Sequence, residues 1–169
     1  RLHGRCRLGA YSQRLGLQQL ASWGCTMNSL FAFLHHIAAF ALVAALVVEF
    51  VLIRDELSAK SARKILVADL ALAISATVIL VVGLLRVFYF EKGASYYFQN
   101  TSFIAKLTLF VLVALLSAYP TIQFLSWRGA VRRQQAPNVS PQRLRAIRAV
   151  IHWELAGVVF IIVFAVLMA

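Results

Sequence analysis

Seven ionisable side chains lie inside long apolar stretches of this sequence, where hydrocarbon surroundings make each of them costly. They are His35, His36, Glu49, Asp69, Lys106, His152 and Glu154. An Asp, Lys or Arg at the centre of a membrane helix costs about 2.5–3.5 kcal/mol even on the mild insertion scale. These seven residues are therefore the candidates for a functional site.

The expected depth of each residue along its helix sorts these side chains, together with Arg86, into two layers. The basic layer is expected near the outer ends of the helices and contains His35, His36, Arg86 and Lys106. The acidic layer is expected near the inner ends and contains Glu49, Asp69, His152 and Glu154. Two separate sites can thus be predicted, one at each end of a helical bundle.

The basic layer holds the residue types that a haem protein uses. A neutral imidazole can ligate iron, and Lys and Arg can pair with the propionates of a porphyrin, so we predict a haem or porphyrin site. His35 is the preferred iron ligand because it shares a helix face with Glu49, whereas His36 points about 100° away. Lys106, Arg86 and His36 would lie nearby. The alternative is a snorkelling lysine and a hydrogen-bonded interfacial histidine without a ligand.

The acidic layer offers a second hypothesis, from a different class of function. Glu49, Asp69, His152 and Glu154 could form a protonatable inner site in a small proton- or metal-ion-translocating subunit. Two alternatives need no such function. Glu49 and Asp69 can pair with Arg54, Arg63 or Lys64 of the nearby loop. His152 can simply belong to the entry turn of the last helix. A membrane assembly protein without any chemistry is the third possibility.

The composition excludes an ordinary water-soluble domain. Hydrophobic side chains make up 62% of the 169 residues and charged ones 14%, against about 45–50% and about 25% in soluble proteins. The net charge of +11 favours contact with anionic lipid headgroups over nucleic acid, because no soluble basic domain remains outside the apolar stretches.

Four apolar stretches predict an all-α, four-helix transmembrane bundle. The expected spans are residues 30–53, 65–85, 103–125 and 149–169, each within the roughly 17–25 residues that cross a bilayer. The loops at 54–64 and 126–148 contain 4 and 6 Lys plus Arg, and the loop at 86–102 contains 2. The positive-inside rule then places the first and third loops in the cytoplasm and both termini outside.

Three local patterns refine these helices. Ser140 and Pro141 are typical of a helix start, so a basic helical turn should lead into the last span. Pro120 interrupts the hydrogen bonds of the third helix, and Ser117 or Thr121 can satisfy the break. Aromatic side chains around the outer loop predict an interfacial belt. They are Phe88, Tyr89, Phe90, Tyr96, Tyr97 and Phe98.

Residues 1–26 differ from the rest of the chain. They contain four Arg, no acid and both cysteines, Cys6 and Cys25, and Met27 follows them. We predict that they are a non-native or disordered prefix, with an Arg-rich transit peptide as the alternative. The transmembrane domain at 27–169 contains no cysteine, which excludes disulfides and thiolate metal sites there.

Three motifs carry a resemblance to a known family. Leu34-His35-His36, the run from Gly83 to Gly93, and Lys106 with the later Ser117-Ala118-Tyr119-Pro120-Thr121 resemble the predicted bacterial membrane proteins catalogued as domain of unknown function 2214. The resemblance runs from about Met27 to the C-terminus. It implies a multi-pass protein of the bacterial inner membrane and no known activity.

A more distant similarity is to the CopD-like superfamily and the HemJ-type protoporphyrinogen oxidases. It rests on a Leu-His pair near the start of the first helix and a Lys early in the third. It implies haem b as cofactor and His35 and Lys106 as the functional pair. As partners we expect a membrane redox protein or a second copy of the chain. Phe40 and Glu49 depart from the HemJ pattern, which argues against oxidation of protoporphyrinogen itself.

Overall fold

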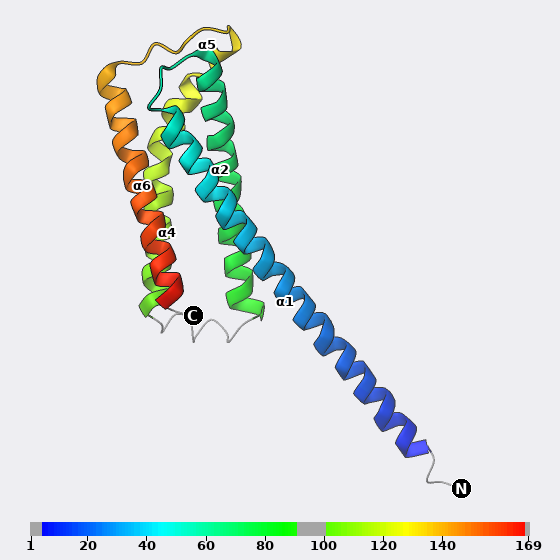
Figure 1. Ribbon diagram of the computed structural model, residues 1–169. Coiled ribbons are helices and arrows are strands. Elements are labelled where there is room, and N and C mark those ends of the chain that lie inside the picture. Colours follow the sequence, from blue (N-terminus) through cyan, green and yellow to red (C-terminus); the bar gives the residue numbers. More distant parts are fainter. Residues whose placement is uncertain (1–4, 91–100, 168–169) are drawn as a thin grey trace.

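The computed structural model describes the backbone of residues 5–90 and 101–167 (Figure 1). Helices dominate this part of the chain, and it contains no strand, so the predicted all-α class is confirmed. The elements are α1 (Arg5–Leu52), α2 (Ala59–Leu85), the π-helical turn η1 (Arg86–Phe90), α4 (Thr101–Ser126), α5 (Arg128–Arg132) and α6 (Pro141–Leu167).

Four helices contain segments that are long and apolar enough to cross a membrane. These segments are Ser29–Leu52, Ala59–Phe88, Phe103–Arg132 and Pro141–Leu167, and each overlaps one predicted span. The predicted span starts at residues 65 and 149 lie inside helices that begin earlier, α2 at Ala59 and α6 at Pro141. The sequence predicts the additional turns at the start of α6 but not those of α2, whose Ala, Lys and Arg residues are good helix formers.

Serine caps explain where these two helices begin. The Ser58 hydroxyl accepts a hydrogen bond from the backbone N–H of Ser61 at 3.1 Å, and the Ser140 hydroxyl accepts one from Arg143 N–H at 3.4 Å. Each bond satisfies an N–H group of the first turn that has no partner within the helix. The predicted helix start at Ser140 and Pro141 is therefore confirmed.

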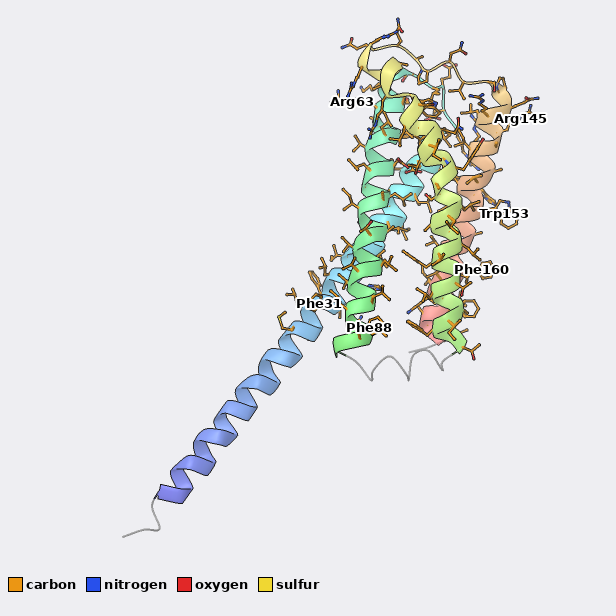
Figure 2. The ribbon with its side chains drawn as sticks, turned by 180° about the vertical axis from the view of Figure 1, so that it is seen from behind. Phe31, Arg63, Phe88, Arg145, Trp153 and Phe160 are labelled. Atoms are coloured by element: carbon orange, nitrogen blue, oxygen red, sulfur yellow. The ribbon has the colours of Figure 1, made fainter. Side chains whose placement is uncertain are left out.

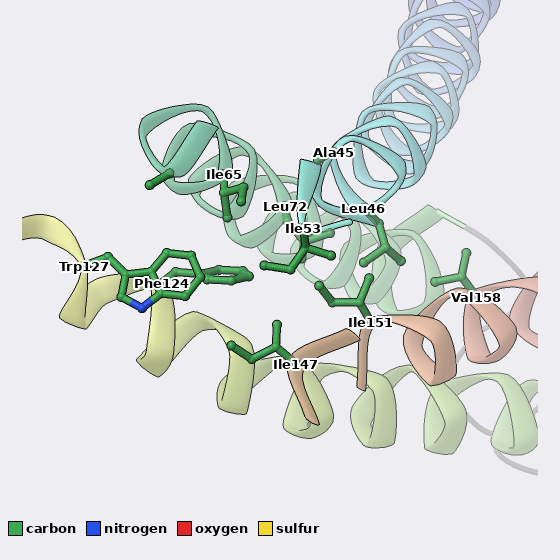
Figure 3. Close-up of a cluster of buried hydrophobic side chains, with 11 residues drawn as sticks. Ala45, Leu46, Ile53, Ile65, Leu72, Phe124, Trp127, Ile147, Ile151 and Val158 are labelled. Carbon is green, nitrogen blue, oxygen red and sulfur yellow. The ribbon is translucent and has the colours of Figure 1, made fainter. Parts of the chain in front are cut away.

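The helices pack as two pairs, α1 with α2 and α4 with α6. Figure 1 shows the pairs close together at the end that carries α5 and separated at the opposite end. The main apolar core lies toward the α5 end (Figure 3). Its buried members are Ala45, Leu46, Ile53, Ala62, Ile65, Leu72, Phe124, Trp127, Ile147, Ile151 and Val158.

At the opposite end the described core is much smaller. It consists of buried Val87 and Phe103, with Leu107 packed against them. The N-terminal half of α1 projects away from the other helices (Figure 1) and includes residues 5–26 of the predicted prefix. The interpretation of those residues as a prefix stays a prediction.

Arg148 joins the first and last helices at the α5 end. Its Nε donates to the backbone carbonyl of Ile53 at 2.9 Å and its Nη2 to that of Arg54 at 3.4 Å. These carbonyls follow the last turn of α1, where the helix leaves carbonyl groups without intrahelical partners. Arg148 therefore fastens the end of α1 to α6.

The outer surface has the pattern that a bilayer requires. Phe40, Leu115 and Val166 are 73%, 67% and 69% exposed, and Figure 2 shows Trp153 and Phe160 along the outer side of α6. Arg63 and Arg145 both lie at the α5 end, on opposite sides of the bundle (Figure 2). The two most basic segments thus share one end of the bundle, as predicted, while the side of the membrane that this end faces stays a prediction.

Candidate functional site

A pocket of about 310 Å³ lies at the end where the helix pairs separate. Its lining comes from α1, α2, η1, α4 and α6. The four residues of the predicted basic layer all contribute to this lining, namely His35, His36, Arg86 and Lys106. Side chains that are far apart in the sequence are therefore brought to one cavity.

His35 packs against α2 through a glycine. A Cβ atom at Gly83 would lie 3.4 Å from His35 Cε1 and 3.7 Å from Nδ1, so the bare backbone at this position leaves room for the imidazole. The ring also hydrogen-bonds to the backbone of Ile79, one turn earlier. Its Nδ1 atom is buried and has no hydrogen-bond partner in the described part of the chain. The contact of Gly83 with the His35 ring could not be predicted from the sequence.

His36 takes a different environment from its neighbour. Its side chain is exposed, and its Nδ1 lies 2.6 Å from the backbone oxygen of Ala32. The two imidazole rings are 6.1 Å apart and nearly perpendicular. This agrees with the expectation that adjacent helical residues point in different directions and leaves His35 as the more enclosed imidazole.

Lys106 and Arg86 supply positive charge on the other sides of the pocket. Both act electrostatically on His35, and the Lys106 ammonium lies 5.7 Å from the centre of the Phe103 ring. Most of the remaining lining is apolar and includes Leu84, Val87, Leu107, Phe110, Ile161 and Ala165. The pocket therefore suits a ligand that combines anionic groups with an apolar body.

The π-helical turn η1 contributes to this arrangement. It begins at Arg86, directly after α2, and π-turns are frequent at functional sites because they change the direction of successive side chains. Sequence reasoning missed it, since a π-turn has no distinct hydrophobic period. Of the six residues in the predicted aromatic belt, only Phe88 has a described side chain, and it is exposed. The other five lie outside the described side chains.

Three of the four residues of the predicted acidic layer are buried. Glu49, Asp69 and Glu154 are 0%, 5% and 1% exposed and come from α1, α2 and α6. The Thr121 hydroxyl donates a hydrogen bond to Asp69 Oδ1 at 2.6 Å. The Thr121 hydroxyl donates its hydrogen to Asp69, so it cannot also donate to the Leu116 carbonyl, which Pro120 leaves without a backbone N–H donor. Ser117 is the remaining candidate for that hydrogen bond.

His152 does not join the three carboxyl groups. Its side chain is exposed, and its ring lies 6.3 Å from that of Phe50. The Arg54 guanidinium lies over the same Phe50 ring, 4.0 Å from its centre. The Glu49 oxygens have no hydrogen-bond partner among the described residues, so the alternative pairing of Glu49 with Arg54 is not formed.

The described residues also contain no metal centre of the usual composition. No group of three or more His, Cys, Asp or Glu side chains in this part of the chain is placed to hold a metal ion. The acidic layer as described is therefore a cluster of carboxyl groups rather than a coordination site.

Comparison with known families agrees with this architecture. The profile of the predicted membrane protein family DUF2214 matches residues 27–169. The chain belongs to the DUF2214 family. The match begins at Met27, where the predicted transmembrane domain also begins.

No curated protein and no solved structure matches the chain. The distant similarity to the CopD-like superfamily and the HemJ-type oxidases receives no support from the comparisons. The function of this DUF2214 protein must therefore be argued from its own residues.

Proposed function

We propose that this DUF2214 protein binds haem b or a closely related porphyrin in the pocket between its two helix pairs. The observation that carries the proposal is the meeting of one imidazole and two cations, His35, Arg86 and Lys106, at a single cavity. Porphyrins with propionate groups combine an apolar macrocycle with carboxylates, which is the chemistry that this lining complements.

The available atoms fit such a ligand. The buried Nδ1 of His35 lacks a partner among the described residues, and an imidazole with one nitrogen held by the backbone is a typical metal ligand. The pocket of about 310 Å³ lies at the lower end of the range for small-molecule sites, roughly 300–1,000 Å³. A porphyrin would therefore be partly enclosed, with one edge toward the space between the helix pairs.

Each part of the lining has a distinct role in this proposal. His35 would ligate the iron, Arg86 and Lys106 would neutralise the carboxylates, His36 would border the site, and the apolar walls would exclude water. The bound iron would supply one-electron chemistry. A redox role would require an electron partner in the same membrane, and we place that membrane as the bacterial inner membrane, with the pocket toward its outer side.

Absorbance spectroscopy tests the proposal directly. The full chain is expressed with ample haem supply, purified in detergent, and recorded in the oxidised and dithionite-reduced states. We expect a Soret band and reduced-state bands typical of haem b. His35→Ala should abolish or shift the bands, because it removes the proposed iron ligand.

His152→Ala is the matched control, since it removes an exposed imidazole outside the pocket. Its spectrum should equal that of the unmodified chain. A purified protein without a Soret band, or a band that His152→Ala removes and His35→Ala leaves intact, would overturn the proposal.

A further inference from the structure

The three carboxyl groups of the acidic layer have no part in the proposed haem site. Along α1 the separation is large, because the 14 residues from His35 to Glu49 correspond to roughly 21 Å of helix rise. Any role of the carboxyl cluster can therefore be tested independently of the pocket.

Two of the three carboxyl groups are buried without hydrogen-bond partners among the described residues. Glu49 is 0% and Glu154 1% exposed, and neither carboxylate oxygen of either residue has a hydrogen-bond partner in the described part of the chain. Glu49 lies within electrostatic range of both Asp69 and Glu154. The three carboxyl groups thus come from three different helices and lie within electrostatic range of one another.

The surrounding elements provide little compensating charge. From α4, the Thr121 hydroxyl bonds to Asp69, and from α5, Arg128 acts electrostatically on Asp69. Neither group is among the electrostatic influences on Glu49 or Glu154. The apolar neighbours Leu46 and Ile151 complete the burial. Two glutamates are therefore left to be neutralised by something else.

Three adjacent negative charges in such surroundings would be strongly unfavourable. An isolated ionised carboxylate is among the most expensive groups to bury, and like charges repel more strongly where the effective dielectric constant is low. The charge must be compensated by protons or by a bound cation. The described side chains do not form a metal site, which favours protons.

We propose that Glu49, Asp69 and Glu154 form a proton-binding site at the junction of α1, α2 and α6. Glu49 and Glu154 hold the exchangeable protons, and Asp69 is held in place by Thr121. Neighbouring carboxyl groups of this kind titrate as one coupled unit. Ionisable groups inside a membrane protein also commonly mark a pathway for protons.

Infrared spectroscopy of the detergent-purified full chain tests this site. Protonated carboxyl groups absorb at a C=O frequency separate from that of carboxylates, and the band shifts when H₂O is replaced by D₂O. We expect such a band at neutral pH, with a loss of intensity in Glu49→Gln and in Glu154→Gln. Asp55→Asn and Glu56→Gln are the controls, because both residues are exposed on the loop after α1, and they should leave the band unchanged.

Unfolding measurements on the same variants show whether a lost infrared band reflects the removed carboxyl group or a misfolded protein. A neutral glutamine replaces a neutral glutamic acid with little change of charge or shape, so the unfolding midpoints of both glutamine variants should stay close to that of the unmodified chain. Glu49→Lys should lower the midpoint sharply, since it buries a new charge.

Three outcomes would overturn the inference. The first is the absence of any carboxylic-acid band that Glu49→Gln or Glu154→Gln reduces. The second is a band that sodium or calcium chloride removes at constant pH, which would indicate a metal cation as the ligand. The third is equal loss of the band in the Asp55 and Glu56 controls. A missing Soret band would not affect the inference, so the two proposals fail separately.

Discussion

Thr121 shows how a single hydroxyl connects the two helix pairs. It lies directly after Pro120 in α4, and its Oγ1 donates to Asp69 Oδ1 on α2 at 2.6 Å. Asp69 is nearly fully buried, so water cannot replace this donor. The hydroxyl therefore both links the pairs and fixes the orientation of one member of the carboxyl cluster.

The first prediction at this scale concerns that hydroxyl. Thr121→Val keeps the shape of the side chain but leaves Asp69 without its donor, so the free energy of unfolding should fall by about 0.5–2 kcal/mol, the range for such bonds in membrane proteins. Denaturant unfolding in detergent micelles measures the change.

Thr121→Ser retains the hydroxyl and is the matched control for this experiment. It should lose clearly less stability than Thr121→Val. If the valine variant is as stable as the unmodified chain, the bond between Thr121 and Asp69 contributes nothing to the joining of the helix pairs.

At the scale of elements, the contact between α4 and α6 depends on a glycine. A Cβ atom at Gly157 would collide with Val113 Cγ2. Valine in a helix is restricted to one strongly preferred rotamer, so its methyl group cannot simply turn away. Gly157 thus permits a backbone approach of the kind that small residues provide in membrane helix packing.

Gly157→Ala should therefore destabilise the protein. Overpacking of this kind costs about 1–3 kcal/mol, although alanine is intrinsically favoured over glycine in helices by about 0.8–1.0 kcal/mol. The double variant with Val113→Ala should recover most of the loss, because the clashing methyl group is removed. Denaturant unfolding of both single variants and the double variant measures the coupling.

Gly129→Ala is the control for this cycle. An added Cβ at Gly129 meets nothing within 4 Å, so its unfolding free energy should change little. Simple additivity of Gly157→Ala and Val113→Ala would contradict the close contact.

Helix periodicity explains which features of these elements could be predicted. The lengths of the apolar stretches predict four helices, and consecutive helices run in opposite directions. These directions alone predict that His35, Arg86 and Lys106 lie at one end of the bundle. They also predict that Glu49, Asp69 and Glu154 lie toward the other end. The exclusion of His152 could not be predicted, because it depends on the rotation of α6 about its own axis. Gly83 as a wall and Thr121 as a donor also depend on rotation and on contacts between distant helices.

At the scale of the whole molecule, basic residues gather at the α5 end and the pocket lies at the other end. The positive-inside rule predicts that the α5 end faces the cytoplasm. Single cysteines at Gln135 and Thr101, both exposed, can report the orientation in a background with Cys6→Ser and Cys25→Ser.

We expect a membrane-impermeant maleimide to label Thr101→Cys in intact cells. Gln135→Cys should react only after the membrane is permeabilised, because its loop would be cytoplasmic. The reverse labelling pattern would show that the pocket faces the cytoplasm and that the predicted orientation is wrong.

Because the main core lies at one end of the bundle, a small rotation between the helix pairs would be amplified at the other end. Between Phe124 in the core and Lys106 at the pocket, α4 rises by roughly 27 Å, so a rotation of about 5° between the helix pairs displaces the pocket wall by about 2 Å. The helix pairs are held together mainly at the core end, so such a rotation would displace the pocket walls more than the core. A core substitution that changed this angle would change the width of the pocket without altering any residue that lines it.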